Sequence, residues 1–104
     1  MKKYTVNITD EVEEEIRNAF LYIHERSPDN AVKWFRGLYR AIDTLETMPE
    51  RCPFIREKDA FKVEVRNLLY HSHRIIFTVN VADSIVEVHA FRHGAQDDLQ
   101  GPSE

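Results

Sequence analysis

The feature that constrains this chain most is a pair of consecutive amphipathic patterns separated only by Ser27-Pro28. In the first pattern, apolar residues recur at helical spacing at Val12, Ile16, Ala19, Phe20 and Ile23. The second pattern continues to Pro49 through Ala31, Trp34, Phe35, Leu38, Ile42, Leu45 and Met48. Neither helix could bury its apolar stripe alone, and so short a loop permits only an antiparallel hairpin.

Local signals mark where each helix begins. Asp10 with Glu13 three residues later resembles a capping box, which predicts a helix start at Asp10. Ser27 offers a hydroxyl for the next N-cap, and Pro28 fits the first helical position because its missing N–H costs nothing there.

Short strands are predicted on both sides of the hairpin. Residues 4–8 alternate between apolar and polar side chains, which is typical of a strand with one covered face. After an irregular connection, strands are predicted over residues 61–66, 74–81 and 85–91, the last bounded by Gly94. Their short connections predict an antiparallel three-stranded meander.

This order predicts an α+β fold, with the two-helix hairpin packed on one face of the sheet. We expect a single domain over residues 1–95 and a flexible C-terminal tail over residues 96–104, which contain little apolar material. A chain of 104 residues can bury enough surface to fold without disulfides or metals.

Composition narrows the class of protein. Fourteen Lys and Arg against eighteen Asp and Glu give a formal charge of −4, which argues against coating nucleic acid through bulk charge. The lone Cys52 cannot form an internal disulfide, so a reducing compartment, the cytoplasm, is expected. No apolar run is long enough to span a membrane, and the isolated glycines form no phosphate-binding loop, so no cofactor is expected.

Charged residues point to a possible working surface. Period-two alternation places Lys62 and Arg66 opposite Val65, and Arg74 opposite Ile75. If the helices cover the apolar face, these three cations project together from the other face, where guanidinium groups could bind phosphate. The alternative is that they are ordinary charges on a solvated sheet face.

The histidines invite two hypotheses. A metal site is disfavoured, because on one continuous strand His89 and His93 would be roughly 13 Å apart, and His71 and His73 lack a convincing third ligand. His93 beside Arg92 could act as a general acid or base, or could simply end the strand structurally. The apolar residues outside the main stripes are candidates for a partner contact or are incidentally exposed: Leu21, Tyr22, Val32 and Tyr39.

Several strings together resemble the RelE/ParE toxin superfamily of type II toxin–antitoxin systems. They are the second-helix pattern from Pro28 to Pro49, Val65-Arg66 with His73-Arg74-Ile75-Ile76-Phe77, and Val88-His89-Ala90-Phe91-Arg92-His93-Gly94-Ala95. The last string is the most specific and is similar to the ParE-like, or plasmid-stabilisation, branch. Two positions depart from the family pattern: Gln96 replaces a basic residue, and His73 replaces a tyrosine.

The resemblance implies a growth-inhibiting toxin neutralised by a cognate antitoxin, either as a homodimer or in a hetero-oligomer with it. ParE-like members act on DNA gyrase, whereas RelE-like members cleave mRNA on the ribosome. For an RNase, the implied catalytic candidates are Arg74, Arg92 and His93. The implied target-binding residues are Lys62, Arg66, Arg74, His89, Arg92 and His93. The antitoxin is expected on the hairpin, at Leu21, Tyr22 and Tyr39, and along an exposed sheet edge.

The acidic charge favours the ParE-like hypothesis, because RNA binding depends heavily on phosphate neutralisation. An mRNA endoribonuclease is the second hypothesis. A third is an inactive or repurposed binding module, since Gln96 removes one positive charge at the end of the last strand.

Overall fold

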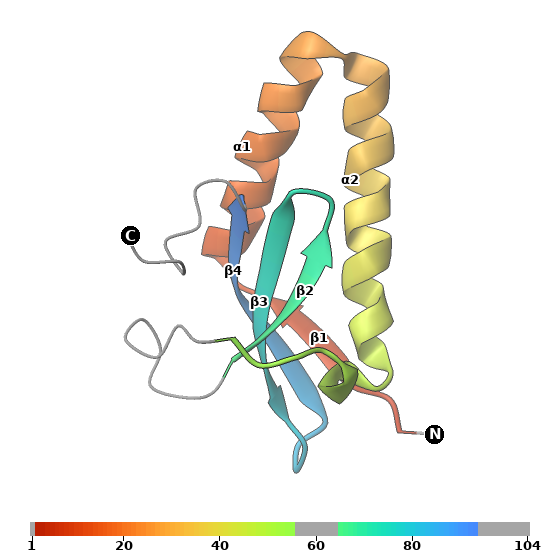
Figure 1. The fold of residues 1–104 in the computed structure, drawn as a ribbon, viewed down its shortest axis with the longest axis vertical. Coiled ribbons are helices and arrows are strands. Elements are labelled where there is room, and N and C mark those ends of the chain that lie inside the picture. Colours follow the sequence, from red (N-terminus) through yellow and green to blue (C-terminus); the bar gives the residue numbers. More distant parts are fainter. Residues whose placement is uncertain (1, 56–64, 94–104) are drawn as a thin grey trace.

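The computed structural model describes residues 2–55 and 65–93, and its elements follow the predicted order. β1 (Thr5–Ile8) precedes α1 (Asp10–Arg26) and α2 (Pro28–Asp43), which form the hairpin seen in Figure 1. Two 3₁₀ turns, η1 (Thr44–Glu46) and η2 (Pro49–Arg51), follow α2. The chain then forms β2 (Arg66–Tyr70), β3 (His73–Asn80) and β4 (Ile85–His93).

The four strands form one mixed sheet in the order β1-β4-β3-β2. β2, β3 and β4 are antiparallel neighbours, which confirms the predicted meander and the α+β class. The end predicted for the first of these strands, at residue 66, is wrong, because β2 continues from Arg66 to Tyr70. β1 pairs with β4 in parallel, and the long helical hairpin between them in sequence supplies the crossover that parallel neighbours need. In Figure 1 the turn of the hairpin projects beyond the end of the sheet.

The helix ends differ in detail from the predictions. Thr9, not Asp10, caps α1, because its hydroxyl accepts a hydrogen bond from the N–H of Val12 at 3.2 Å. Pro28 occupies the first turn of α2 as predicted, but the Ser27 hydroxyl makes no capping bond. The second apolar stripe ends earlier than expected, since Met48 lies past the helix in a left-handed conformation and is exposed.

The main core lies between the hairpin and one face of the sheet, here called the helix face. Its buried residues include Val12 and Ile16 from α1 and Leu38 and Ile42 from α2. From the sheet it takes Ile75, Phe77, Val86, Val88 and Phe91. Trp34 also packs against this core, as its place in the second apolar stripe predicts.

The opposite face of the sheet carries a second, smaller cluster of Val65, Ile76 and Ala90, with Ile55 packed against it. The prediction that Val65 lies under the helices is therefore wrong. Residues directly opposite each other in an antiparallel ladder project to the same side, so the pairing of strands, not alternation alone, decides the face. The rest of the predicted strand, residues 61–64, and the tail 96–104 lie outside the described residues.

A glycine in α2 allows β2 to approach closely. A Cβ added at Gly37 would lie 2.2 Å from the Tyr70 hydroxyl, which donates a hydrogen bond to the backbone carbonyl of Trp34 at 2.9 Å. Burial raises the pKa of this phenol, so the hydroxyl remains a donor at neutral pH. Gly37 therefore serves helix–sheet packing rather than backbone flexibility.

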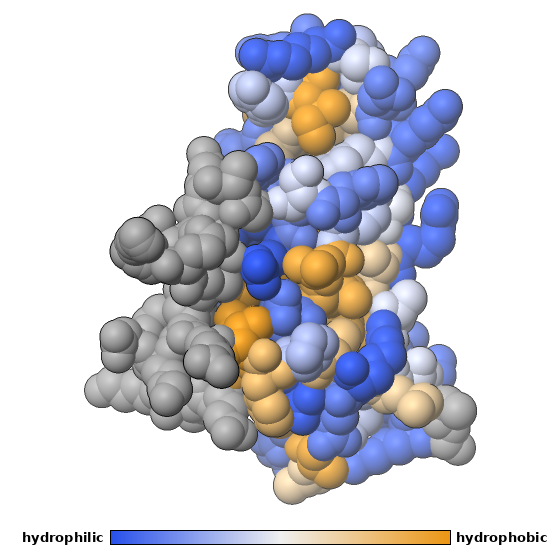
Figure 2. All heavy atoms as spheres, in the orientation of Figure 1, coloured by the Kyte–Doolittle hydropathy of each residue, from blue (hydrophilic) through white to orange (hydrophobic). Residues whose placement is uncertain are grey.

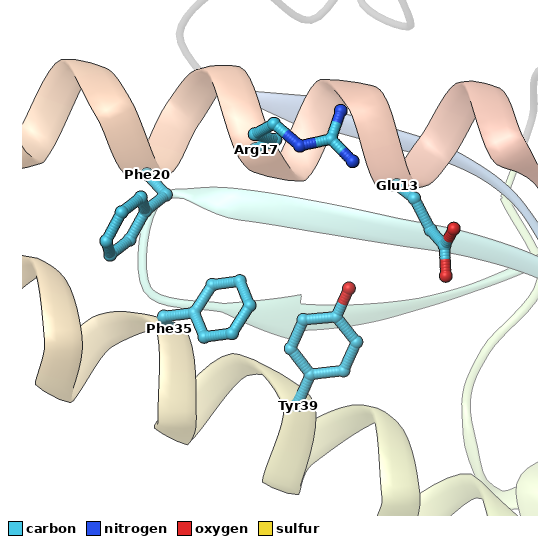
Figure 3. A pocket seen from close by; sticks show the side chains of 5 residues that line it. All are labelled: Glu13, Arg17, Phe20, Phe35 and Tyr39. Atoms are coloured by element: carbon cyan, nitrogen blue, oxygen red, sulfur yellow. The ribbon is translucent and has the colours of Figure 1, made fainter.

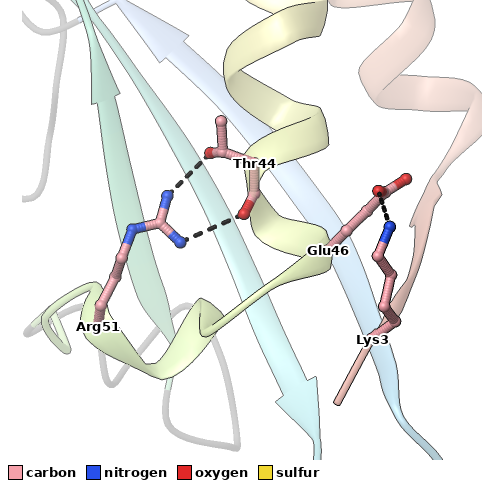
Figure 4. Close-up of polar contacts among 4 residues, drawn as sticks. All are labelled: Lys3, Thr44, Glu46 and Arg51. Atoms are coloured by element: carbon pink, nitrogen blue, oxygen red, sulfur yellow. Dashed lines mark hydrogen bonds and ion pairs between the residues drawn. The ribbon is translucent and has the colours of Figure 1, made fainter. Parts of the chain in front are cut away.

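Polar contacts close the lower end of the hairpin (Figure 4). The Arg51 guanidinium donates to the Thr44 hydroxyl at 2.8 Å and to the Thr44 carbonyl at 3.3 Å, satisfying groups just past the end of α2. Lys3 forms an ion pair with Glu46 at 3.6 Å, linking the chain before β1 to η1. Both contacts are exposed, so each contributes little to stability.

Candidate functional site

Two arginines lie side by side on the sheet face opposite the helices. Arg74 of β3 and Arg92 of β4 are directly paired, and Arg74 donates to the amide oxygen of Asn67 at 3.0 Å. Asn67 is the buried polar residue of this face and is 7% exposed. Its buried amide oxygen therefore fixes the orientation of the Arg74 guanidinium. We call this side, carrying Arg74 and Arg92, the arginine face.

Arg66 does not belong to the arginine face, and the prediction that it projects beside Arg74 is wrong. It pairs with Phe77, which lies in the main core, and so it projects toward the helix side. Its guanidinium donates to the carbonyls of Glu50 and Cys52 at 2.9 and 2.6 Å, and lies 3.9 Å from the ring centre of Phe54. These contacts occupy Arg66 in holding the connection before β2.

His89 lies on the arginine face because of an irregularity in the ladder. The register shifts between Ile76 and Phe77, which leaves His89 opposite no β3 residue. Its Nε2 atom lies 2.8 Å from the hydroxyl of Thr78. A hydroxyl and an imidazole thus accompany Arg74 and Arg92 on one side of the sheet.

His93 points the other way. It pairs directly with His73 on the helix face, and their ring centres are 4.9 Å apart. Arg92 and His93 therefore project to opposite sides, as successive residues of a strand do. The predicted acid–base role of His93 beside Arg92 is not supported by this geometry.

His93 instead lines a hollow of about 680 Å³ between the hairpin and the end of the sheet, here called the histidine hollow. Its lining residues are Ala19, Tyr22, Ile23, Trp34, His71, Ser72, His73 and His93. The ring of His73 stacks on Phe91 at 4.5 Å and meets Trp34 edge-on at 5.6 Å.

His73 is held in an unusual environment. Burial, and to a lesser extent His93 and His71, lower the pKa of His73 below its ordinary value. Its Nδ1 atom is buried and makes no hydrogen bond among the residues that the structure describes. The imidazole is therefore neutral at physiological pH and retains an unused polar atom.

The three residues expected to bind the antitoxin do not share one surface. Leu21 and Tyr22 are 52% and 61% exposed, as a contact surface requires. Tyr39 instead packs against the main core and lines a second cavity of about 450 Å³ between the helices. Figure 3 shows this cavity, which Glu13, Arg17 and Phe20 of α1 share with Phe35 and Tyr39 of α2.

Tyr39 is chemically distinct within that interhelical cavity. Burial and the neighbouring Glu13 carboxylate raise the pKa of its phenol, against a smaller opposite effect of Arg17. Its ring centre lies 4.9 Å from that of Phe35, which in turn lies 5.4 Å from that of Phe20. The cavity is thus lined by contiguous aromatic rings, with the charged side chains of Glu13 and Arg17 on its α1 side (Figure 3).

Other chemistry has little support in the described chain. Cys52 is buried and burial raises the pKa of its thiol, which disfavours a nucleophilic thiolate. Within residues 2–55 and 65–93, no group of three or more His, Cys, Asp or Glu residues is placed to hold a metal ion. None of the helices there combines the length and apolar character needed to cross a membrane.

The contact of Asn67 with Arg74 and that of Thr78 with His89 were not predicted from the sequence. Asn67 follows Arg66 at the start of β2, and nothing in the local pattern shows that this polar residue is buried. Lys62, also expected at the target surface, lies outside the described residues. On the side seen in Figure 2, apolar side chains form separate areas near the hairpin tip and over the strands.

Comparison with known proteins finds solved structures with a similar fold. A chain of the archaeal RelE–RelB complex from Pyrococcus horikoshii OT3 matches with a TM-score of 0.58 and 16% identity, over 91% of this chain and 99% of that one. A chain of the toxin–antitoxin complex RelBE2 from Mycobacterium tuberculosis matches with a TM-score of 0.58 and 18% identity, over 89% and 93%. No curated protein sequence matches significantly.

The fold is therefore the one that these two chains share, and a family model confirms the predicted membership of the RelE/ParE superfamily. The family model for the ParE toxin of the type II toxin–antitoxin system parDE matches residues 6–98. This chain belongs to that family and is a toxin of a type II toxin–antitoxin system.

Proposed function

We propose that this protein is a ParE-like cytoplasmic toxin that inhibits growth by acting on DNA gyrase and is silenced by a cognate antitoxin. The observation that carries the choice of target is the separation of His93 from Arg74 and Arg92 by the sheet. An RNase that used these three residues would need them around one phosphodiester. The net charge of −4 supports the same choice, because it disfavours strong binding to RNA.

The arginine face is the proposed surface for gyrase. Arg74 and Arg92 present guanidinium groups side by side, and the buried Asn67 fixes the orientation of Arg74. Fixed guanidinium groups suit carboxylates of a protein target, and less side-chain freedom is lost on binding when they are already oriented. His89 borders this surface, whereas Arg66 is occupied in internal contacts.

A supercoiling assay with purified gyrase tests this proposal. The unmodified toxin is expected to inhibit supercoiling, and Arg74→Gln and Arg92→Gln to lose most of that inhibition while remaining folded. Arg36→Gln, which removes an exposed charge of α2, is the matched control and should inhibit normally. Full inhibition by both arginine variants would remove the arginine face from the gyrase contact.

A ribosome-dependent mRNA endoribonuclease is the second candidate, favoured by one specific observation. His89, rather than His93, is the imidazole that lies on the arginine face, with its Nε2 atom beside the Thr78 hydroxyl. Cleavage of mRNA in a translation extract that is lost in His89→Gln and kept in His93→Gln would favour this activity over gyrase. Absence of cleavage alongside gyrase inhibition would exclude it.

The antitoxin is proposed to contact the exposed side of α1 through Leu21 and Tyr22, and to add a strand at an outer edge of the sheet. That edge is β1 or the part of β2 after Asn67, since residues 53–55 already pair with residues 65–67. Leu21→Asp should weaken the complex by at least tenfold, a loss typical of a buried apolar contact replaced by a charge. Unchanged affinity would remove Leu21 from the interface. Co-purification with an antitoxin without any toxicity would identify a repurposed binding module.

A further inference from the structure

The histidine hollow has the size and lining of a small-ligand site. Its volume of about 680 Å³ lies within the range of sites that bind small molecules. Ile23, Trp34 and Tyr22 make the helical wall apolar and aromatic, while the strand end contributes imidazoles and the Ser72 hydroxyl. A ligand there would have an apolar body facing the helices and a polar head facing the sheet.

The polar end of the hollow favours a negatively charged head. Among the described residues, no Asp or Glu lines the hollow. The Arg26 guanidinium lies 4.0 Å from the ring centre of Tyr22, which adds positive charge next to one wall. The imidazole of His73 lines the hollow, and an anionic oxygen there would accept a hydrogen bond from it once it is protonated.

We propose that the histidine hollow binds a small organic anion, whose apolar or aromatic body packs on Trp34 and Ile23 and whose carboxylate or phosphate head contacts His73 and His93. The site lies on the helix face, whereas Arg74 and Arg92 lie on the arginine face. Occupancy of the hollow therefore does not require the surface proposed for gyrase, and the two proposals can fail separately.

Binding of an anion should be accompanied by proton uptake. A negative head beside His73 favours its charged form and so raises the depressed pKa of that imidazole, which makes affinity increase as pH falls from 8 to 6. Of the neighbouring titratable groups, His93 of β4 and His71 of the turn oppose protonation of His73. The elements packed around it also carry Glu15, Tyr22, His24 and Arg26 of α1, Arg40 of α2, Tyr70 of β2 and Arg92 of β4.

The single tryptophan makes the proposal directly testable. Because Trp34 lines the hollow and no other tryptophan exists, its fluorescence reports occupancy in the unmodified protein. Benzoate and phenyl phosphate are the probes, and each should give a saturable change. Acetate, which has the head alone, and benzyl alcohol, which has the body alone, should bind at least tenfold more weakly, since each lacks one set of contacts.

Variants distinguish a specific binding site from non-specific attraction to surface charge. His73→Asn and His93→Asn should each weaken benzoate binding about tenfold, the loss expected for one hydrogen bond to a charged group. His24→Asn is the matched control, because His24 packs on Phe20 and lies outside the hollow, and it should bind normally. Calorimetry in two buffers of different ionisation enthalpy should show proton uptake on binding to the unmodified protein.

Three results would overturn the proposal. They are a Trp34 signal that benzoate and phenyl phosphate do not change, equal binding of benzoate by the protein and both histidine variants, and binding without proton uptake. Saturable binding of Zn²⁺ that excludes benzoate would replace the anion by a metal. If His73→Asn fails to fold, the fluorescence and calorimetry of the unmodified chain still decide the outcome.

Discussion

The helix face of the sheet is built from large side chains, with Ile75, Phe77 and Phe91 packed under both helices, whereas the arginine face centres on the small cluster of Val65, Ile76 and Ala90. The first arrangement leaves no room for charge at its centre. The second accommodates Asn67 and Arg74 next to buried apolar groups. Stability is thus concentrated on one side of the sheet, and the other side is the surface that we propose for recognition.

The largest expected effect is on the helix face. Phe77→Ala removes a fully buried ring at the centre of the main core and should lower the free energy of unfolding by about 3–5 kcal/mol. Urea denaturation measures this loss. Ile76→Ala, the next residue but on the arginine face, is the comparison and should cost about 2–3 kcal/mol. Equal losses would show that the two clusters contribute alike.

The next effect tests how tightly α2 sits on the sheet. Gly37→Ala places a methyl group against the Tyr70 hydroxyl and should cost about 1–3 kcal/mol, despite alanine's better helix propensity. Removing the hydroxyl in Gly37→Ala/Tyr70→Phe should recover part of this loss, as measured by urea denaturation. A Gly37→Ala protein as stable as the unmodified chain would contradict this close approach.

A smaller effect separates the two arginines that alternation alone had grouped together. Arg66→Gln removes donors to two backbone carbonyls and should lower the free energy of unfolding by about 1–2 kcal/mol. Arg74 donates to the Asn67 side chain on the arginine face, and Arg74→Gln should lower the free energy of unfolding by less. Thermal melts measure both. The reverse order would place Arg66, not Arg74, among the groups available for recognition.

The smallest expected effect is a pH dependence of stability, which arises from His73 on the helix face. Since the folded protein lowers the pKa of His73, the unfolded chain binds a proton more readily. This contribution to stability is fully present above the unfolded value of about 6.5 and is lost as pH falls below it. His73→Phe should flatten the decline in melting temperature between pH 7 and pH 5, while His24→Asn should not.

The amino-acid sequence by itself determined the order of elements, the antiparallel hairpin and the side of β3 that faces the helices. These follow from local periodicity: Val12 to Ile23 at helical spacing, and Ile75 and Phe77 alternating with Arg74 and Ile76. The family resemblance also came from contiguous strings. Such signals are readable because each depends on residues near one another in the chain.

Tertiary structure alone decided how the strands pair, and pairing assigns every side chain of a strand to one face. Arg66 lies on the helix side because it pairs with Phe77, and His93 lies there because it pairs with His73. The shift in the β3–β4 ladder places His89 on the arginine face. A one-residue change in register reverses all of these assignments without altering any local pattern. The histidine hollow, assembled from α1, α2, the turn between β2 and β3, and the strands β3 and β4, depends on the same long-range pairing.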